Sequence, residues 1–130
     1  MTIYKTYKEA HEKLGIPGSY QRGTIGTAET GVQSLKITAD PNSYDKILEN
    51  GKRILYVGRG NKPTPAHPVR DQDSSDQDLF RTSIRTKTPF PVLYKPAPHH
   101  VELLGYYKVI VVKQAQRKGV KFYYAELQLV

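Results

Sequence analysis

The sequence contains no cysteine, which excludes a disulfide bond and a cysteine-based zinc site. The four histidines, His11, His67, His99 and His100, offer no metal-ligand spacing beyond one adjacent pair. No apolar run approaches the roughly 18 residues of a membrane helix, and residues 1–14 are too charged for a signal peptide. We therefore expect a soluble intracellular protein with no metal or other cofactor, in the nucleus of a eukaryote or in the cytoplasm or nucleoid of a bacterium.

Acidic residues are few relative to basic ones. The sequence has twelve Asp and Glu and twenty Lys and Arg, so the formal net charge is +8. Such a charge favours a polyanionic partner, with nucleic acid first, although a basic surface that only serves solubility is the alternative. The basic residues gather in glycine-containing segments at 21–23, 51–53, 58–62 and 116–119, and in a further segment at 81–87 that has neither glycine nor proline. Basic residues in loops are a common source of phosphate contacts.

A chain of 130 residues is long enough for one domain with its own core. We predict a single domain over 1–130, in which 1–17 form an N-terminal helical extension. The helical pattern in this extension runs over 3–14. Shorter helical pieces are predicted at 43–49 and 76–85, strands at 32–39, 53–57, 89–94, 103–112 and 120–130, and loops at 58–75, 95–100 and 114–119. The fold class is therefore mainly β (α+β), as a curved sheet or barrel.

Two tyrosines twelve residues apart, Tyr44 and Tyr56, precede a glycine-rich turn, Gly58-Arg59-Gly60. If the two rings face each other, they can hold one planar group such as a nucleobase taken out of its stack. The alternative is that both rings pack a β-protein core. The turn itself does not match a phosphate-binding loop, which is longer and ends in Gly-Lys-Ser/Thr.

Further motifs follow one another in a fixed order around the tyrosines. They are Gly-Thr-Ile-Gly at 23–26, Gly-Val-Gln-Ser-Leu-Lys-Ile at 31–37, Tyr-Val-Gly-Arg-Gly at 56–60, Ser-Asp-Gln-Asp-Leu at 75–79, Pro-Val-Leu-Tyr at 91–94, Gly-Tyr-Tyr-Lys-Val at 105–109, and Phe-Tyr-Tyr at 122–124 with Leu127. In this order the chain from about residue 23 to 129 resembles the SRA (SET- and RING-associated, or YDG) domains, which bind modified cytosine in DNA.

The resemblance implies a PUA-like twisted β-barrel that flips one modified base, 5-methylcytosine or 5-hydroxymethylcytosine, out of duplex DNA. Two loops, at 23–31 and 61–71, would enter the DNA. The implied base pocket comprises Tyr44, Asp45, Tyr56, Val57, Gly58 and Arg59. The implied contacts with the DNA backbone or grooves come from Arg22, Thr24, Lys62, Arg70, Arg81 and Arg85.

The chain departs from the SRA pattern in and around the pocket. Ile47 stands where 5-methylcytosine-binding members place an aspartate, and Asp45 and Glu49 are the nearby carboxylates. Val57 replaces the threonine after the second tyrosine, and Arg59 replaces a small residue. The signature segment at 103–105 reads Leu-Leu-Gly, without Tyr or Asp. A domain that recognises another DNA modification, as in a modification-dependent restriction endonuclease, is therefore an alternative.

No pair of acid and base or nucleophile is placed beside the tyrosines, so we expect a binding module and not an enzyme. The acidic run at 71–78 has no Glu-x-Lys or Asp-x-Lys after it at a nuclease spacing. The expected partner is double-stranded DNA with a modified base, with no membrane partner, and a longer parent chain would add a nuclease or chromatin-modifying domain. The alternatives are a PUA-like RNA-binding domain and an enzyme for a nucleotide-like substrate.

Overall fold

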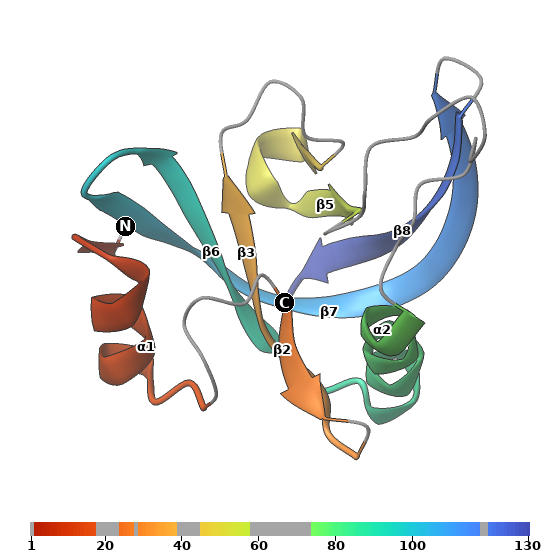
Figure 1. Ribbon diagram of the computed structural model, residues 1–130, viewed down its shortest axis with the longest axis horizontal. Coiled ribbons are helices and arrows are strands. Elements are labelled where there is room, and N and C mark those ends of the chain that lie inside the picture. Colours follow the sequence, from red (N-terminus) through yellow and green to blue (C-terminus); the bar gives the residue numbers. More distant parts are fainter. Residues whose placement is uncertain (1, 18–23, 28, 39–44, 58–73, 118–119) are drawn as a thin grey trace.

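The computed structural model describes residues 2–17, 24–27, 29–38, 45–57, 74–117 and 120–130, and most of these residues form β-strands (Figure 1). The strands are β1 (Ile3–Tyr4), β2 (Thr24–Thr27), β3 (Gly31–Thr38), β4 (Lys46–Leu48), β5 (Arg53–Tyr56), β6 (Phe90–Ala97), β7 (His100–Arg117) and β8 (Val120–Leu129). The helices are α1 (Tyr7–Leu14), the 3-10 turn η1 (Glu49–Gly51) and α2 (Ser74–Thr86). Within this described part of the chain, neither α-helix is long and apolar enough to cross a membrane.

The described strands form one mixed sheet in the order β2-β3-β6-β7-β8-β5-β4, and β1 pairs with β7 beside this path. Strands β3 and β6 run parallel, and the other pairs are antiparallel. In Figure 1 the long strand β7 is strongly bent and runs across the whole molecule, so the sheet is curved. The path ends at β2 and β4, so over the described residues the sheet is curved but not closed. The predicted mainly β architecture is confirmed.

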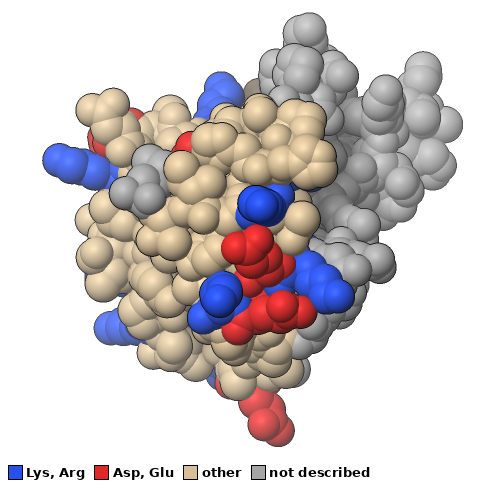
Figure 2. Space-filling view, turned by 90° about the vertical axis from the view of Figure 1, so that its left-hand side faces the viewer, with Lys and Arg blue, Asp and Glu red and all other residues tan. Residues whose placement is uncertain are grey.

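Helix α1 begins later than the sequence pattern predicts. Thr6 is the N-cap, with an extended backbone (φ −139°), and its hydroxyl accepts a hydrogen bond from the Glu9 amide at 3.1 Å. The prediction of helix from residue 3 is therefore wrong, because Ile3–Tyr4 pairs with β7 as β1. Gly15 ends the helix in the left-handed conformation (φ 67°). Acidic and basic side chains lie together on the face of the molecule where α1 lies (Figure 2).

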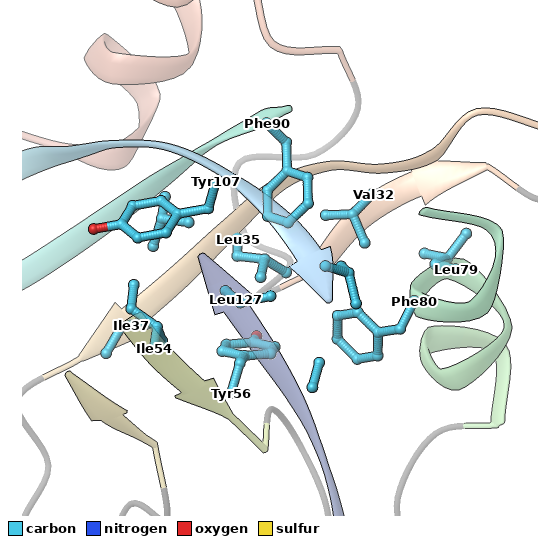
Figure 3. Close-up of a cluster of buried hydrophobic side chains, with 13 residues drawn as sticks. Val32, Leu35, Ile37, Ile54, Tyr56, Leu79, Phe80, Phe90, Tyr107 and Leu127 are labelled. Carbon is cyan, nitrogen blue, oxygen red and sulfur yellow. The ribbon is translucent and has the colours of Figure 1, made fainter. Parts of the chain in front are cut away.

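Each face of the sheet has its own hydrophobic core. The main core lies among the strands of the curved sheet, and α2 adds Leu79 and Phe80 at one side of it (Figure 3). Its members are Val32, Leu35, Ile37, Ile54, Tyr56, Leu79, Phe80, Phe90, Val92, Tyr107, Val109, Ala125 and Leu127. The smaller core lies beneath α1 and consists of Tyr4, Ala10, Leu93 and Val101. Because successive side chains on a strand point to opposite faces of the sheet, β3 has side chains on both faces. Leu35 and Ile37 enter the main core, whereas the Nζ of Lys36 lies 4.7 Å from the ring centroid of Tyr7 on α1.

Helix α2 packs directly on the start of β3. The Ser83 hydroxyl accepts a hydrogen bond from the Val32 amide at 2.7 Å. Gly31 has φ 76°, and a Cβ atom there would lie 2.5 Å from the Ser83 Oγ and 2.9 Å from the Ser83 amide nitrogen. A glycine is therefore required at this position both by the backbone conformation and by the close approach of the helix.

The predicted helical piece at 43–49 is wrong for the residues described within it. Lys46–Leu48 form strand β4, and helical hydrogen bonding is confined to η1. The cause is the turn that follows, where Glu49 (φ 52°), Asn50 (φ 57°) and Gly51 (φ 89°) are consecutively left-handed. This turn reverses the chain sharply and sets β4 antiparallel to β5.

Two predicted loops are largely strand. Strand β6 continues to Ala97, which pairs with His100, so the predicted loop at 95–100 shrinks to a turn around His99 (φ 56°). Pro96 is tolerated because it lies at an irregularity of the β6–β7 ladder, between Tyr94 and Ala97. Likewise β7 continues to Arg117, within the loop predicted at 114–119. Long-range pairing with β8 supplies the hydrogen bonds that local propensity does not predict.

Candidate nucleic-acid interface

Strands β4 and β5 form a hairpin in the segment between the two tyrosines of the predicted clamp. Its strands pair antiparallel, with Lys46 opposite Leu55 and Leu48 opposite Arg53. In such a pair, the residue that precedes the first strand lies beside the residues that follow the second. Residue 45, before β4, therefore lies close to residues 56 and 57 at the end of β5.

A hydrogen bond closes this hairpin at its open end. The Oδ1 of Asp45 accepts from the backbone amide of Val57 at 2.7 Å. Asp45 directly follows Tyr44 in the sequence, and Val57 directly follows Tyr56. Tyr44 itself lies outside the described residues. The bond thus joins the two chain segments that carry the predicted clamp.

The turn of the hairpin is attached to the rest of the sheet. The hydroxyl of Tyr107, on β7, donates a hydrogen bond to the Gly51 carbonyl, and the Leu129 amide donates to the Lys52 carbonyl at 2.9 Å. Burial raises the pKa of the Tyr107 hydroxyl above its ordinary value of 10.0, which further favours the neutral form that donates this hydrogen bond. These two bonds hold the hairpin at its closed end while Asp45 holds it at the other.

Arg53 lies in one of the basic segments that the sequence suggests for phosphate contacts. In the structure it is on β5, where its guanidinium binds the carboxylate of Glu126 and lies 3.6 Å from that of Glu49. These carboxylates raise the pKa of Arg53 further, chiefly through the hydrogen bond to Glu126. Lys113 also approaches Glu126, at 3.9 Å. Arg53 is therefore paired with carboxylates in a partly exposed charge network on the sheet.

Tyr56 is part of the main core. Its side chain is 2% exposed, and its ring meets that of Phe80 edge-on, with 5.8 Å between centroids and 73° between planes (Figure 3). Its hydroxyl shares a hydrogen bond of 3.2 Å with the Thr24 hydroxyl. Tyr56 thus has the core-packing role that the sequence left open, and its role in a clamp stays a prediction.

Thr24 is buried in the core, whereas the sequence predicts that it contacts DNA. It is predicted as a contact to the DNA backbone or groove, but its side chain is 3% exposed and its hydroxyl faces Tyr56. The Phe80 ring, on α2, contacts Tyr56, and the sequence pattern does not connect these two residues. Residues 24, 56 and 80 come from three separate elements, and no spacing rule relates them.

The two predicted arginines on α2 are described. Arg81 is exposed and its Nη1 lies 3.4 Å from an Asp78 oxygen, whereas Arg85 donates to the Thr82 hydroxyl at 3.4 Å. Four residues apart, they share one face of the helix. Their contact with DNA stays a prediction. The other candidates of the pocket and backbone sets lie outside the described residues, namely Tyr44, Gly58, Arg59, Arg22, Lys62 and Arg70.

No protein-family model matches the sequence, and no curated protein matches it either. Solved structures do match. The SRA domain of SUVH5 in complex with hemimethylated CG DNA superposes with a TM-score of 0.72 at 19% identity, over 98% of this chain and 84% of that one. The chain has the fold of an SRA domain. The predicted SRA resemblance and PUA-like fold class are confirmed at the level of the fold.

Two larger proteins contain the same SRA fold. The modification-dependent restriction endonuclease TagI matches with a TM-score of 0.68 at 22% identity, over 99% of this chain and 48% of TagI. KRYPTONITE, in complex with mCHH DNA, a histone H3 peptide and SAH, matches with a TM-score of 0.72 at 13% identity, over 99% of this chain and 31% of that protein. The chain therefore corresponds to about half or less of each of these two proteins.

Acidic and basic side chains are mixed on the face of this SRA-like fold where α1 lies (Figure 2). On the α1 side, the exposed residues of the helix include Lys8, Glu12 and Lys13, and Figure 2 shows both signs side by side on this face. A phosphate backbone is attracted by a surface of one sign, and mixed charges largely cancel beyond the Debye length of about 8 Å. The face at α1 is therefore a poor candidate for the nucleic-acid interface.

Proposed function

We propose that this chain binds double-stranded DNA that carries a modified base, and that it holds the base, flipped out of the duplex, between Tyr44 and Tyr56. The observation that carries the proposal is the hydrogen bond of 2.7 Å between Asp45 and the Val57 amide, because it ties together the segments adjoining the two tyrosines. The SUVH5 SRA structures with hemimethylated and with hydroxymethylated CG DNA support it, since they share this fold.

The energetics of base flipping fit the composition of the chain. Unpairing and unstacking one base costs a few kcal/mol, and stacking on aromatic rings returns about 1 to 3 kcal/mol per base. Stacking alone therefore leaves little net affinity. Contacts between cationic side chains and phosphates supply the rest, and the formal charge of +8 provides for them. We assign such contacts to Arg81 and Arg85 among the described residues, and to Arg22, Lys62 and Arg70 in the remainder.

We propose 5-methylcytosine or 5-hydroxymethylcytosine as the base, with Asp45 as the group that binds its exocyclic amine. A carboxylate accepts several hydrogen bonds, so binding the Val57 amide does not prevent this second role. Asp45 is half-buried at the end of the hairpin, next to the clamp in the sequence. Ile47, at the position of the expected aspartate, lies on β4 and is 38% exposed, with no polar group to offer.

The proposed role is recognition without catalysis. The contacts of Tyr56 include the Thr24 hydroxyl and the Phe80 ring, and neither group is an acid or base for chemistry on a nucleotide. The endonuclease TagI and KRYPTONITE are longer chains with the same fold. We therefore propose an intracellular DNA-binding unit that acts beside a nuclease or chromatin-modifying domain.

A competition assay tests this function. Four duplexes that differ in one base, cytosine, 5-methylcytosine, 5-hydroxymethylcytosine or N6-methyladenine, compete for the protein at one fixed salt concentration. A single-stranded RNA is added as a fifth competitor. We expect a duplex with one of the two modified cytosines to bind at least tenfold more tightly than the plain duplex. Equal affinities for all four duplexes would contradict modified-base recognition. Preference for the N6-methyladenine duplex would contradict the assignment of the base to a modified cytosine, and tighter binding to the RNA would favour the RNA-binding alternative.

A further inference from the structure

The ring of Tyr56 is held by contacts from two other elements. The Thr24 hydroxyl, on β2, lies 3.2 Å from the Tyr56 hydroxyl at the tip of the ring. The Phe80 ring, on α2, meets Tyr56 at 73° with 5.8 Å between centroids. Thr24, Tyr56 and Phe80 are 3%, 2% and 1% exposed. The contact at the tip fixes the direction of the side chain, and the contact with Phe80 fixes the rotation of the ring plane.

Both contacts come from a part of the fold that does not pair with the strand of Tyr56. Strand β2 pairs with β3, and β5 pairs with β4 and β8. Helix α2 is fastened to β3 through Ser83, which accepts from the Val32 amide at 2.7 Å and lies against Gly31. Phe80 precedes Ser83 by three residues, so the two lie on the same face of α2. The position of Phe80 over Tyr56 therefore follows from the way α2 docks.

A buried pair of hydroxyls is not needed for core packing alone. Placing a hydroxyl in an apolar environment has a free-energy cost that a hydrogen bond only offsets, and phenylalanine and valine would fill the same space without that cost. What the pair adds is direction, since a hydrogen bond holds only over a narrow range of distance and angle. An aromatic platform for a base benefits from such restraint, because a ring that is already oriented loses less entropy on binding.

We propose that Thr24 and Phe80 are positioning residues of the base site, which orient the Tyr56 ring for stacking. This inference rests on the proposed function, in which Tyr56 stacks on the flipped base. Neither residue touches the base itself. Their effect falls on discrimination between modified and plain duplex, and not on the phosphate contacts that both duplexes share.

The test uses Thr24→Val, which removes the hydroxyl and nearly keeps the shape, and Thr24→Ser, which keeps the hydroxyl. The quantity measured is the ratio of dissociation constants for plain and modified duplex. We expect Thr24→Val to lower this ratio roughly three- to tenfold, the worth of one neutral hydrogen bond. Thr24→Ser retains most of the ratio, and the affinity for plain duplex and its salt dependence stay the same in both variants.

Tyr56→Phe removes the other hydroxyl of the same hydrogen bond, and it replaces Thr24→Val in the test if that variant does not fold. If the hydroxyl pair acts as a unit, the double variant loses no more discrimination than Tyr56→Phe alone. Phe80→Leu keeps apolar volume but loses the ring edge, and we expect the ratio to fall in this variant as well. NMR signals of the Tyr56 ring, assigned by their absence in Tyr56→Phe, report faster ring reorientation in Thr24→Val without DNA.

The outcomes separate the two proposals. If the wild-type protein discriminates and Thr24→Val does so equally well, or weakens both duplexes alike, positioning is wrong and the proposed function stands. Additive losses in the double variant also overturn positioning. If the wild-type protein shows no discrimination, the proposed function fails, and the positioning role fails with it.

Discussion

His11 lies on α1 at a place where its protonation opposes folding. The side chain is 5% exposed, and neither ring nitrogen has a hydrogen-bond partner within the described part of the chain. Burial, followed by the charge of Lys36, lowers the pKa of His11 from its ordinary value of 6.5. The imidazole is therefore neutral in the folded protein under conditions where the unfolded chain already binds a proton.

This difference gives stability a pH dependence with a definite sign. Because the folded-state pKa is lowered, the contribution of His11 is fully present above pH 6.5 and is lost as the pH falls below that value. The loss from one proton is at most about 1.4 kcal/mol per pH unit. Chemical unfolding at pH 7.5 and pH 5.5 measures it. In His11→Leu, which cannot be protonated, we expect a smaller loss, and parallel pH profiles of the two proteins would contradict the assignment.

The sequence predicts which residues belong to the site, but it does not predict how their side chains contact one another. Tyr56 and Asp45 are predicted as site residues from their place in a motif, and the structure adds the hydrogen bond from the Val57 amide to Asp45. The contacts of Tyr56 with Thr24 and Phe80 are not predictable in this way. They depend on how β2, β5 and α2 meet across the core, which is a property of tertiary packing and has no local signal.

At the scale of elements, the junction of α2 and β3 depends on the absence of a side chain at Gly31. An alanine there would adopt φ 76° and place its Cβ 2.5 Å from the Ser83 Oγ and 3.1 Å from the Ser83 Cα. Because backbone atoms of α2 are among these neighbours, the helix itself must shift. We expect Gly31→Ala to lower the free energy of unfolding by about 2 to 4 kcal/mol, the sum of backbone strain and overpacking.

Gly15→Ala is the matched control. Gly15 has a similar φ of 67°, but no atom lies within 4 Å of the position that a Cβ would take there. This variant carries only the backbone cost, about 1 to 2 kcal/mol. Urea unfolding of both variants separates the two contributions. If Gly31→Ala and Gly15→Ala are destabilised equally, the close approach of α2 to β3 does not contribute to stability.

The elements that the sequence predicts well are those whose own composition favours them. Strands β7 and β8 are rich in valine, tyrosine and leucine, and α2 has a regular apolar face. The short strands cannot be predicted from their own composition. β1 and β4 have two and three residues, and each exists because a distant or turn-linked strand pairs with it. Their formation is decided by long-range hydrogen bonding and by the left-handed turn at 49–51, not by local pattern.

At the scale of the whole molecule, the curved sheet divides the protein into two unlike sides. One side has the small core under α1 and an outer surface of mixed charge (Figure 2). The other has α2, the β4–β5 hairpin and the main core that includes Tyr56 (Figure 3). The proposed base site belongs to the second side, where the hairpin is fixed at both ends by hydrogen bonds to Asp45 and from Tyr107.

We propose Tyr44 as one wall of the pocket for a modified base. The ratio of dissociation constants for plain and 5-methylcytosine duplexes, measured for the wild-type protein and for Tyr44→Ala at the same salt concentration, tests this role. We expect the wild-type protein to prefer the modified duplex at least tenfold, and Tyr44→Ala to bind both duplexes alike with the plain-duplex affinity unchanged, because one stacked base is worth about 1 to 3 kcal/mol. If a folded Tyr44→Ala variant keeps the wild-type ratio, Tyr44 is not part of the base pocket.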